Sequence, residues 1–514
     1  MRTTNAFKNM ISTLSSHFTS MLLGFISQAI FVRILGTEYL GVNGLFSNII
    51  SMLGVVELGI GSAIIYNLYK PIAQEDKEKI KTLMKFYQKC YRIIAFIIFL
   101  IGMLIIPFLN IIVGETSIAQ NEIILIYMLF IIDIVCSYLL TYKRSILYAN
   151  QKNYIIDIVH IFYLIILNSI QITILLNTKN YILYLSFKIV MRLLENIVIT
   201  IIANQKYNYL TEKDYNKLDK SIINDIIKKV KGLFIHKIGA FLVAGTDNII
   251  ISTFLGVSYV GLYSNYYMII NALTTIINQI FSAFKASIGN LLVTSDNEKT
   301  YSVYKKLQFL NFWLAMISSI GIFIVMESFI KIWVGEQYIL PRLVLVVLTI
   351  NNYVYITKLC ASNFKEAAGI FYEDRFVPII ESIVNIVASI VFLKIFGLAG
   401  VFMGTICSNM ITHLYTYPKF VYKKIFGKRQ VQYYKDGGKY LIITILLGSI
   451  TYFISTFTIC NNGILQVIVN IALVLIIPNI LVILIFHNTE EFKYYYDLLL
   501  NVLKKRKMSS FTKN

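Results

Sequence analysis

The sequence predicts an all-α polytopic membrane protein with about 14 transmembrane helices of about 20 residues each. Of its 514 residues, 57% are hydrophobic and 14% are charged, whereas soluble proteins contain about 25% charged residues. The chain holds only 6 Pro, which favours long continuous helices, and 36 Tyr, which suit helix ends at the lipid headgroups. We therefore expect most of the protein's surface to face lipid.

Apolar segments long enough to cross a bilayer recur along the whole chain. They lie at 11–35, 42–66, 91–112, 123–147, 154–176, 181–203, 233–255, 260–284, 307–330, 343–364, 376–396, 400–421, 440–458 and 463–486. The longest connection between them, 204–232, is too short to build a hydrophobic core, so we expect no separate soluble domain. The first segment is too long for the apolar core of a signal peptide and is interpreted as a retained helix.

Lys and Arg are concentrated in alternate loops between these segments and in both tails. Because such residues mark the cytoplasmic side, the pattern predicts that both termini are cytoplasmic, in the bacterial inner membrane. The formal net charge of +20 then faces membrane lipids rather than nucleic acid. The five cysteines are isolated and lack metal-ligand spacing, so we expect no metal site and no disulfide.

The two halves of the chain share motifs at a nearly constant offset. Leu-Gly-Thr-Glu-Tyr-Leu-Gly at 35–41 returns 220 residues later as Leu-Gly-Val-Ser-Tyr-Val-Gly at 255–261. Further matches are Asp76 with Asp296, Glu78 with Glu298, Lys79 with Lys299, and Val113-Gly114-Glu115 with Val334-Gly335-Glu336. One match can arise by chance, but several in register indicate an internal repeat.

The repeat predicts the domain organisation. We expect a six-helix N-terminal lobe at 1–204 and a linker with an amphipathic helix at 205–232. A six-helix C-terminal lobe at 233–430 follows, and 431–514 adds two transmembrane helices and a basic tail. An even number of spans in each lobe gives parallel repeats, which in transporters are related by an axis along the membrane normal. This architecture favours a carrier.

The repeated loop and the run that begins at Asp247 and continues through Leu255-Gly256 to Val260-Gly261-Leu262-Tyr263-Ser264 support a family resemblance. They resemble the polysaccharide biosynthesis/export flippases of the Wzx type. These belong to the MOP superfamily, with the MATE drug exporters and the lipid II flippases. The resemblance covers the whole chain, including the layout of twelve plus two helices.

The resemblance implies a transporter rather than an enzyme. Its cargo would be an undecaprenyl-diphosphate-linked oligosaccharide, moved from the inner to the outer leaflet by alternating access. The product would enter O-antigen, capsule or exopolysaccharide assembly, with a polysaccharide polymerase and other assembly proteins as partners. No cofactor is implied, and a proton or sodium gradient would supply the energy.

Three alternative functions were weighed against the flippase. A MATE-type cation or drug antiporter shares the fold, but basic residues in the spans favour an anionic cargo. A lipid II flippase differs only in the glycan, for which no sequence mark was found. A membrane glycan polymerase is disfavoured because the predicted outward loops are short and leave no room for an external active site.

Charged residues inside the predicted spans are the candidate functional residues, because charge within the bilayer is costly and usually functional. Arg33 ends the first span and suits a diphosphate, since a guanidinium binds phosphate bidentately. Asp247 lies in the motif that carries the resemblance. Glu57, Asp247 and Asp133 are the candidates for the coupling ion. The structural alternatives are an interfacial anchor for Arg33 and helix packing for Asp247.

The sixth span carries Lys188, Arg192 and Glu195 on one helical face, spaced i, i+4 and i+7. We expect that face to look toward protein or water, with an Arg192–Glu195 pair that lowers the cost of burial. His17 and Lys237 occupy equivalent positions in the two halves and are candidates for receiving the diphosphate, with interfacial placement as the alternative. No catalytic residue or metal ligand is expected.

Overall fold

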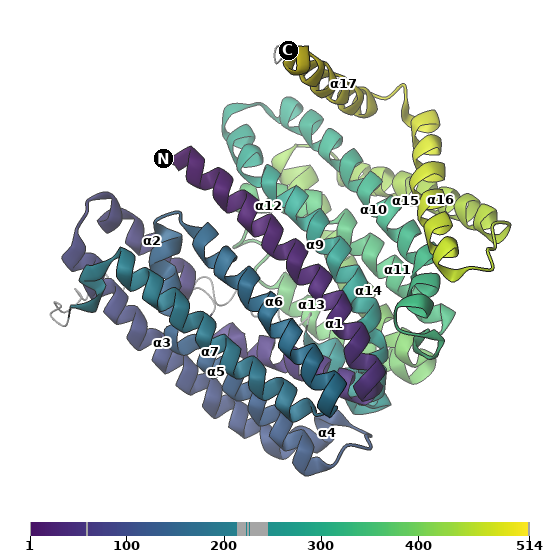
Figure 1. Cartoon of the computed structure of the whole chain (residues 1–514). Helices are drawn as coiled ribbons and strands as arrows, with labels where there is room; N and C mark the ends of the chain where they lie inside the picture. The colour runs from purple at the N-terminus through teal and green to yellow at the C-terminus, as the bar shows by residue number, and fades with distance from the viewer. Residues whose placement is uncertain (1, 58–59, 213–222, 224–225, 227–244, 512–514) are drawn as a thin grey trace. The chain divides into compact units, whose positions relative to one another are not determined.

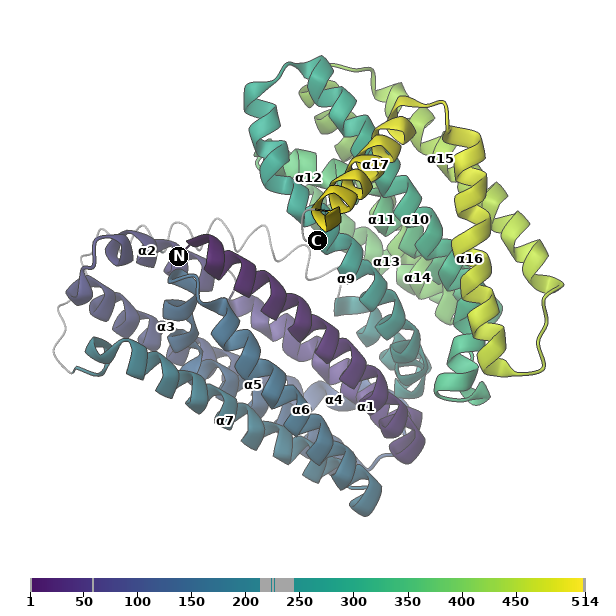
Figure 2. The ribbon, with the colours of Figure 1, turned by 45° about the horizontal axis from the view of Figure 1, so that its top comes forward.

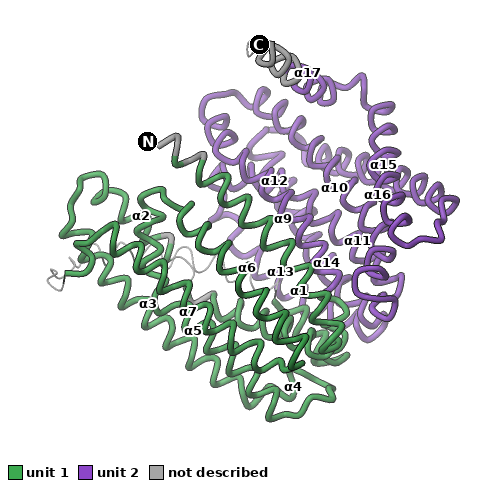
Figure 3. The backbone as a smooth tube through the Cα atoms, in the orientation of Figure 1, with its two compact units in different colours: residues 1–264 green, residues 265–514 purple. Residues whose placement is uncertain are grey.

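The computed structural model describes residues 2–57, 60–212, 223, 226 and 245–511. Within these residues the regular secondary structure is helical and contains no strand, which confirms the all-α fold class. The chain forms two compact units, Met1–Ser264 and Asn265–Asn514 (Figure 3). The boundary between them lies inside one helix, so each unit contributes part of it.

The first unit is a layered helical bundle (Figure 1). Its elements are α1 (Arg2–Leu53), η1 (Gly54–Glu57), α2 (Ile60–Ala73), α3 (Lys77–Ile105), η2 (Ile106–Phe108), α4 (Leu109–Val113), α5 (Gln120–Ala149), α6 (Asn153–Thr178), α7 (Tyr181–Lys206), η3 (Asn208–Thr211), a helix at 245–255 and the start of α9 (Val257–Thr294). α1 packs against α6, α6 against α7, α7 against α5, and α5 against α3. The neighbouring faces of α5, α6 and α7 therefore meet inside this unit.

The second unit is built around α10 (Figure 2). It contains the rest of α9, then α10 (Asn297–Trp333), η4 (Glu336–Tyr338), α11 (Arg342–Thr357), α12 (Leu359–Ala367), α13 (Val377–Phe396), α14 (Leu398–Ile411), the π-helical η5 (Thr412–Ile425), α15 (Gln430–Thr456), α16 (Gly463–Phe486) and α17 (Glu490–Phe511). α10 contacts α11, α15, α16 and α17. Phe309 and Phe312 of α10 pack with Tyr440 and Phe486, so the two additional spans belong to this core.

Ten helices in the described part of the chain are long and apolar enough to cross a membrane, fewer than the number of apolar segments predicted. The first two segments share α1, because this helix kinks at Gly36, with a φ of 85°, and continues. α7 carries three charged residues in its centre, and α2 and α14 have 14 residues each. The segment at 233–255 lies partly outside the described residues.

The unit boundary also lies later in the chain than the predicted division into 1–204 and 233–430. Residues 245–264 belong to the first unit because they pack on it: the Ser252 hydroxyl donates to the Ile112 carbonyl. Of the linker expected at 205–232 with its amphipathic helix, only 205–212, 223 and 226 are among the described residues.

The repeated motifs adopt the same local structures in both halves. Asp76 and Asp296 each cap the N-terminus of a helix, since their Oδ1 atoms accept from the backbone N–H of Lys79 at 2.9 Å and of Lys299 at 2.8 Å. The glycines of the Val-Gly-Glu motifs both have a positive φ, as do Gly36 and Gly256, the first glycines of the two Leu-Gly motifs. Backbone conformations that favour glycine therefore recur at equivalent positions in the two halves of the chain.

One close contact joins the two copies of the Leu-Gly motif inside the first unit. A Cβ atom on Gly41 would collide with the backbone carbonyl of Val257, and one on Gly261 would collide with the carbonyl of Thr37. Thr37 and Val257 are themselves equivalent positions, so the contact is reciprocal. Only glycine permits the two backbones to approach this closely.

Candidate functional site

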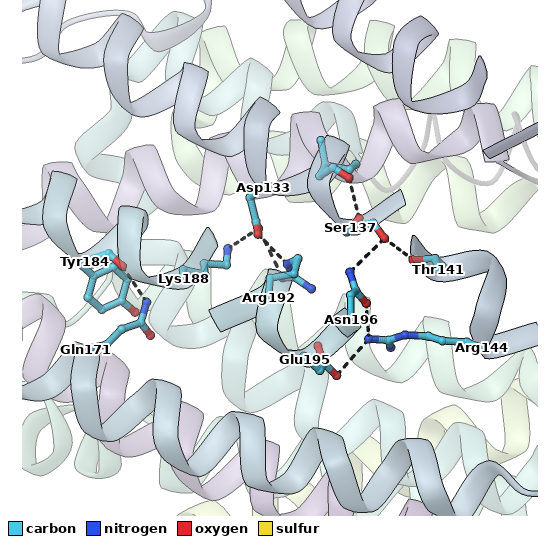
Figure 4. Close-up of polar contacts among 11 residues, drawn as sticks. Asp133, Ser137, Thr141, Arg144, Gln171, Tyr184, Lys188, Arg192, Glu195 and Asn196 are labelled. Carbon is cyan, nitrogen blue, oxygen red and sulfur yellow. Dashed lines mark hydrogen bonds and ion pairs between the residues drawn. The ribbon is translucent and has the colours of Figure 1, made fainter. Parts of the chain in front are cut away.

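The charged face of α7 lies against α5 and α6, as its helical spacing predicts (Figure 4). Asp133 of α5 binds two cations of α7. Its Oδ1 lies 2.6 Å from Arg192 Nε, and its Oδ2 lies 3.2 Å from Lys188 Nζ. The Asp133 side chain is 12% exposed, whereas those of Lys188 and Arg192 are 25% and 27% exposed. The two cations therefore remain partly accessible.

Glu195 has a separate set of partners. Its Oε1 lies 3.1 Å from Arg144 Nη2 of α5 and 2.9 Å from His160 Nδ1 of α6, and its side chain is 1% exposed. Among the described residues, no ion pair within 4.0 Å joins Arg192 to Glu195, and these two side chains attract each other at longer range. Arg192 pairs instead with Asp133, and Glu195 pairs with Arg144. Both of these closer partners lie on α5.

Asn196 links the network to the backbone of α5. Its Oδ1 accepts from Arg144 Nη2 at 3.0 Å, and its Nδ2 donates to the Ser137 carbonyl at 3.4 Å. The Lys188 ammonium also lies 5.1 Å from the ring centroid of Phe130. These contacts fix the orientation of both α7 cations and of Arg144.

The network carries a net positive charge. Lys188, Arg192 and Arg144 supply three cations, and Asp133 and Glu195 supply two carboxylates. One positive charge is therefore in excess before His160 is counted. Because α5 and α6 are long and apolar enough to cross a membrane, such an excess beside them is costly unless an anion offsets it, so the arrangement is suited to binding an anionic group.

A family model described as polysaccharide biosynthesis protein matches residues 6–284. The chain belongs to that family. A search of curated protein sequences found no match.

Solved structures share the fold of this polysaccharide biosynthesis protein. A MATE family multidrug resistance transporter of the MOP superfamily, inward-facing, has a TM-score of 0.63 at 15% identity, over 78% of this chain and 94% of that one. The lipid II flippase MurJ, inward closed, has a TM-score of 0.64 at 15% identity, over 92% and 98%. A MOP superfamily transporter from Pyrococcus furiosus has a TM-score of 0.50 at 13% identity, over 79% and 92%. At these identities the likeness establishes a MOP-type membrane fold.

Two members of the network, Arg144 and His160, were not among the candidates predicted from the sequence. Arg144 and His160 lie inside predicted spans, at 123–147 and 154–176. Their position could have identified them, because any charged or titratable residue within a membrane span is a candidate functional residue. Their pairing with Glu195 depends on contacts between helices, which spacing along one helix does not reveal.

Glu57 forms a second polar site in the first unit. Its Oε1 accepts from the Tyr91 hydroxyl of α3 at 2.9 Å, and the ring of Tyr91 stacks on that of Tyr138 of α5 at 6.1 Å. Gly61 lies beside the pair, where a Cβ would be 3.2 Å from the Tyr91 hydroxyl oxygen. Small residues here therefore let the carboxylate reach between α3 and α5.

The other predicted site residues lie outside the network of Figure 4. Arg33 and His17 are exposed on α1, and Asp247 is partly buried on the helix at 245–255. Lys237 lies outside the described residues. Of the predicted candidates, the structure thus brings together Asp133, Lys188 and Arg192.

The second unit of this family member contains an apolar cavity of about 990 Å³. It runs between α10, α11, η5 and α15, and its lining includes Phe312, Phe323, Tyr353, Leu441 and Tyr452. Polar side chains such as Asn311, Thr357 and His413 also line it, but most of the exposed wall is apolar. This volume lies at the upper end of the range for small-molecule sites.

Proposed function

We propose that this polysaccharide biosynthesis protein is a flippase for an undecaprenyl-diphosphate-linked oligosaccharide. In this proposal it resides in the bacterial inner membrane with both termini in the cytoplasm and moves its cargo from the inner to the outer leaflet. The observation that carries the proposal is the excess positive charge between α5, a helix long and apolar enough to cross a membrane, and its neighbour α7.

A diphosphate needs such a site to cross the bilayer. A single charged side chain at the bilayer centre costs about 2.5–3.5 kcal/mol even on a lenient scale, and a diphosphate carries more than one charge. Arg192 presents a planar guanidinium suited to phosphate oxygens, and Lys188 adds a second donor. Asp133 holds both cations in place, and a phosphate can take its place as their partner while the cargo is bound.

The membrane potential favours the proposed direction. Moving one negative charge outward, away from a negative interior, gains about 2.3 kcal/mol per 100 mV. An ion gradient is the further source of energy that we propose, with Glu57, Asp247 and Asp133 as candidate sites. Glu57 has the most suitable surroundings, because a neutral phenol rather than a cation is its observed partner. Asp133 is engaged by two cations.

The lipid part of the cargo requires an apolar path. The cavity of the second unit offers an apolar wall along α10 and α15, which suits part of an isoprenoid chain. The oligosaccharide would pass on to O-antigen, capsule or exopolysaccharide assembly, with a polymerase and other assembly proteins as partners. A lipid II flippase and a cation exporter are the alternatives, and the excess of cations argues against the exporter.

The test is transport in proteoliposomes. Radiolabelled undecaprenyl-diphosphate oligosaccharide is placed in the inner leaflet, and its arrival in the outer leaflet is measured for the wild type, Arg192→Gln and the control Lys206→Gln, an exposed lysine in the last turn of the same helix. We expect transport by the wild type and the control, and a loss of about tenfold or more for Arg192→Gln. Wild-type protein that moves a cationic dye but not the lipid-linked sugar would refute the proposal.

A further inference from the structure

The helix α17 follows the membrane helix α16 almost directly but differs from it in composition. α16 ends at Phe486 and α17 begins at Glu490, so the start of α17 lies within about 14 Å of the end of α16. α17 is not among the ten helices of the described chain that are apolar enough to cross a membrane. It therefore begins close to the membrane surface that α16 reaches.

α17 has a defined start of its own. The hydroxyl of Thr489 accepts from the backbone N–H of Phe492 at 3.4 Å, which caps the helix, and the N–H of Thr489 donates to the Phe486 carbonyl at 2.8 Å. Glu490 and Glu491 lie in the first turn, where the helix dipole favours negative charge. From this cap α17 turns away from the axis of α16 (Figure 1).

The beginning of α17 packs on α10. The Tyr495 hydroxyl donates to the Lys306 carbonyl at 3.1 Å, and the ring of Phe492 lies 6.3 Å from that of Trp313. The Lys306 ammonium lies 4.7 Å from the ring centroid of Tyr494. Lys306 directly precedes the ninth predicted span, and Lys, Trp and Tyr are typical of span ends at the headgroups. These contacts therefore hold α17 at headgroup depth.

The apolar face of α17 extends beyond this contact. Phe492, Tyr495, Tyr496 and Leu499 are spaced i, i+3, i+4 and i+7 and share one side of the helix. Phe492 and Tyr495 pack against the core around α10. Tyr496 and Leu499 are 54% and 56% exposed. The same face is therefore covered by protein at its start and uncovered further along.

Polar residues occupy the other side of α17. Lys493, Asp497 and Asn501 are spaced i, i+4 and i+8, and all three are exposed. After Asp497 the sequence contains no acidic residue, and it continues with four consecutive cations, Lys504, Lys505, Arg506 and Lys507. Along α17 the acidic residues thus precede the basic ones.

This combination distinguishes the occupant of the uncovered face. An amphipathic helix with an apolar side and a cluster of Lys and Arg lies in the plane of a membrane interface, and its affinity depends on anionic lipids. The apolar side enters the boundary between headgroups and acyl chains, while the cations contact lipid phosphates. The depth of α17 next to α16 and α10 places such a leaflet within its reach.

We propose that α17 is an interfacial helix that binds anionic phospholipids of the cytoplasmic leaflet. Tyr496 and Leu499 enter the leaflet, and the cations at 504–507 bind its headgroups. The bound leaflet anchors α10 and α16, which α17 connects. The inference uses the membrane location proposed above but does not involve the cargo, so it is independent of flippase activity.

The first test measures which side of α17 contacts lipid. Full-length Leu499→Trp and the matched control Asn501→Trp are reconstituted into nanodiscs of phosphatidylcholine and phosphatidylglycerol that contain brominated acyl chains. The signal of the 2 native tryptophans is subtracted with the wild type, and thermal melting confirms folding. We expect the bromolipid to quench the new tryptophan of Leu499→Trp about twofold or more strongly than that of Asn501→Trp.

The second test measures the dependence on charge. One variant combines Lys504→Gln, Lys505→Gln, Arg506→Gln and Lys507→Gln, and its control combines Lys504→Arg, Lys505→Arg and Lys507→Arg. In the wild type, we expect the amides of 496–503 to exchange about tenfold more slowly with phosphatidylglycerol than with phosphatidylcholine alone. High salt should reduce this difference. The glutamine variant should lose it, and the arginine variant should keep it.

Three results would overturn the proposal. Equal quenching in both tryptophan variants, with fast exchange in every lipid, would show a helix that lies in water. Weak quenching of Leu499→Trp with slow exchange would show that protein covers the face. Strong quenching without any effect of lipid charge would refute the role of the cations. None of these results bears on transport, and a wild type that moves no lipid-linked sugar would leave the lipid contact unaffected.

Discussion

Arg192 meets both carboxylate oxygens of Asp133, with Nε 2.6 Å from Oδ1 and Nη2 3.4 Å from Oδ2. This two-point contact fixes the plane of the guanidinium, which a single hydrogen bond would not do. Asp133 also holds Lys188, so one carboxylate positions both cations of the proposed phosphate site. The predictions below follow from this arrangement and from the internal repeat.

Asp133→Asn should tighten anion binding and lower stability. Without the carboxylate, Lys188 and Arg192 repel each other, and we expect the free energy of unfolding to fall by about 1–3 kcal/mol. The freed cations should bind inorganic diphosphate more tightly, and diphosphate should raise the melting temperature more than in the wild type. Melting curves with and without diphosphate measure both effects. Weaker diphosphate binding by Asp133→Asn would show that the two cations do not form an anion site.

Glu195→Leu should destabilise the first unit more than most single substitutions. The change leaves Arg144 in a largely buried place without its carboxylate, which typically costs about 3–5 kcal/mol. Adding Arg144→Met removes the stranded charge, so the double variant should recover much of the loss. Thermal melting of the single and double variants in detergent measures the coupling. Strictly additive losses would contradict the pairing seen here.

Gly41→Ala and Gly261→Ala should be about equally harmful. Each new methyl group would collide with a backbone carbonyl of the other motif copy, and such overpacking costs about 1–3 kcal/mol. Gly289→Ala is the control, because no atom lies within 4 Å of the added Cβ. Yield and melting temperature of the folded protein measure the effect. Tolerance of alanine at both positions would disprove the close approach.

Asp76→Ala should destabilise the first turn of α3, and Asp296→Ala should destabilise the first turn of α10. Loss of an N-cap costs about 1 kcal/mol, and the affected amides are those of Lys79 and Lys299, respectively. We expect faster hydrogen exchange at the amide next to the substituted cap and no change at the equivalent amide. Asp→Asn at either position keeps an acceptor and should exchange like the wild type.

The sequence predicted the fold class and one face of the site, for physical reasons. Lys188, Arg192 and Glu195 share a face because of helical periodicity, which is readable along the chain. Their partners come from other helices: Asp133 lies 59 residues before Arg192, and no local pattern joins them. The recurrence of the capping aspartates and glycines was visible because the repeat preserves spacing.

Other features depend on contacts that spacing does not encode. The helical turn at Val354–Thr357 lies within one apolar stretch, Arg342–Ala367. Asn311 and His413 stabilise it from helices far away in the chain. The kink at Gly36 could be suspected from the glycine, but continuation of α1 beyond it depends on packing. These tertiary contacts join residues that no local sequence pattern relates.

The reciprocal contact of Gly41 and Gly261 bears on the evolutionary origin of the chain. Each motif copy presents the same surface to the other, and Thr37 and Val257 exchange places across the contact. Two identical subunits related by a two-fold axis make an interface of this isologous kind. The contact has the isologous geometry of a dimer interface, which is the geometry expected if two copies of a shorter ancestral gene were fused in tandem. Substitutions on one side of it are then constrained by the other side, although the two lie 220 positions apart in the sequence.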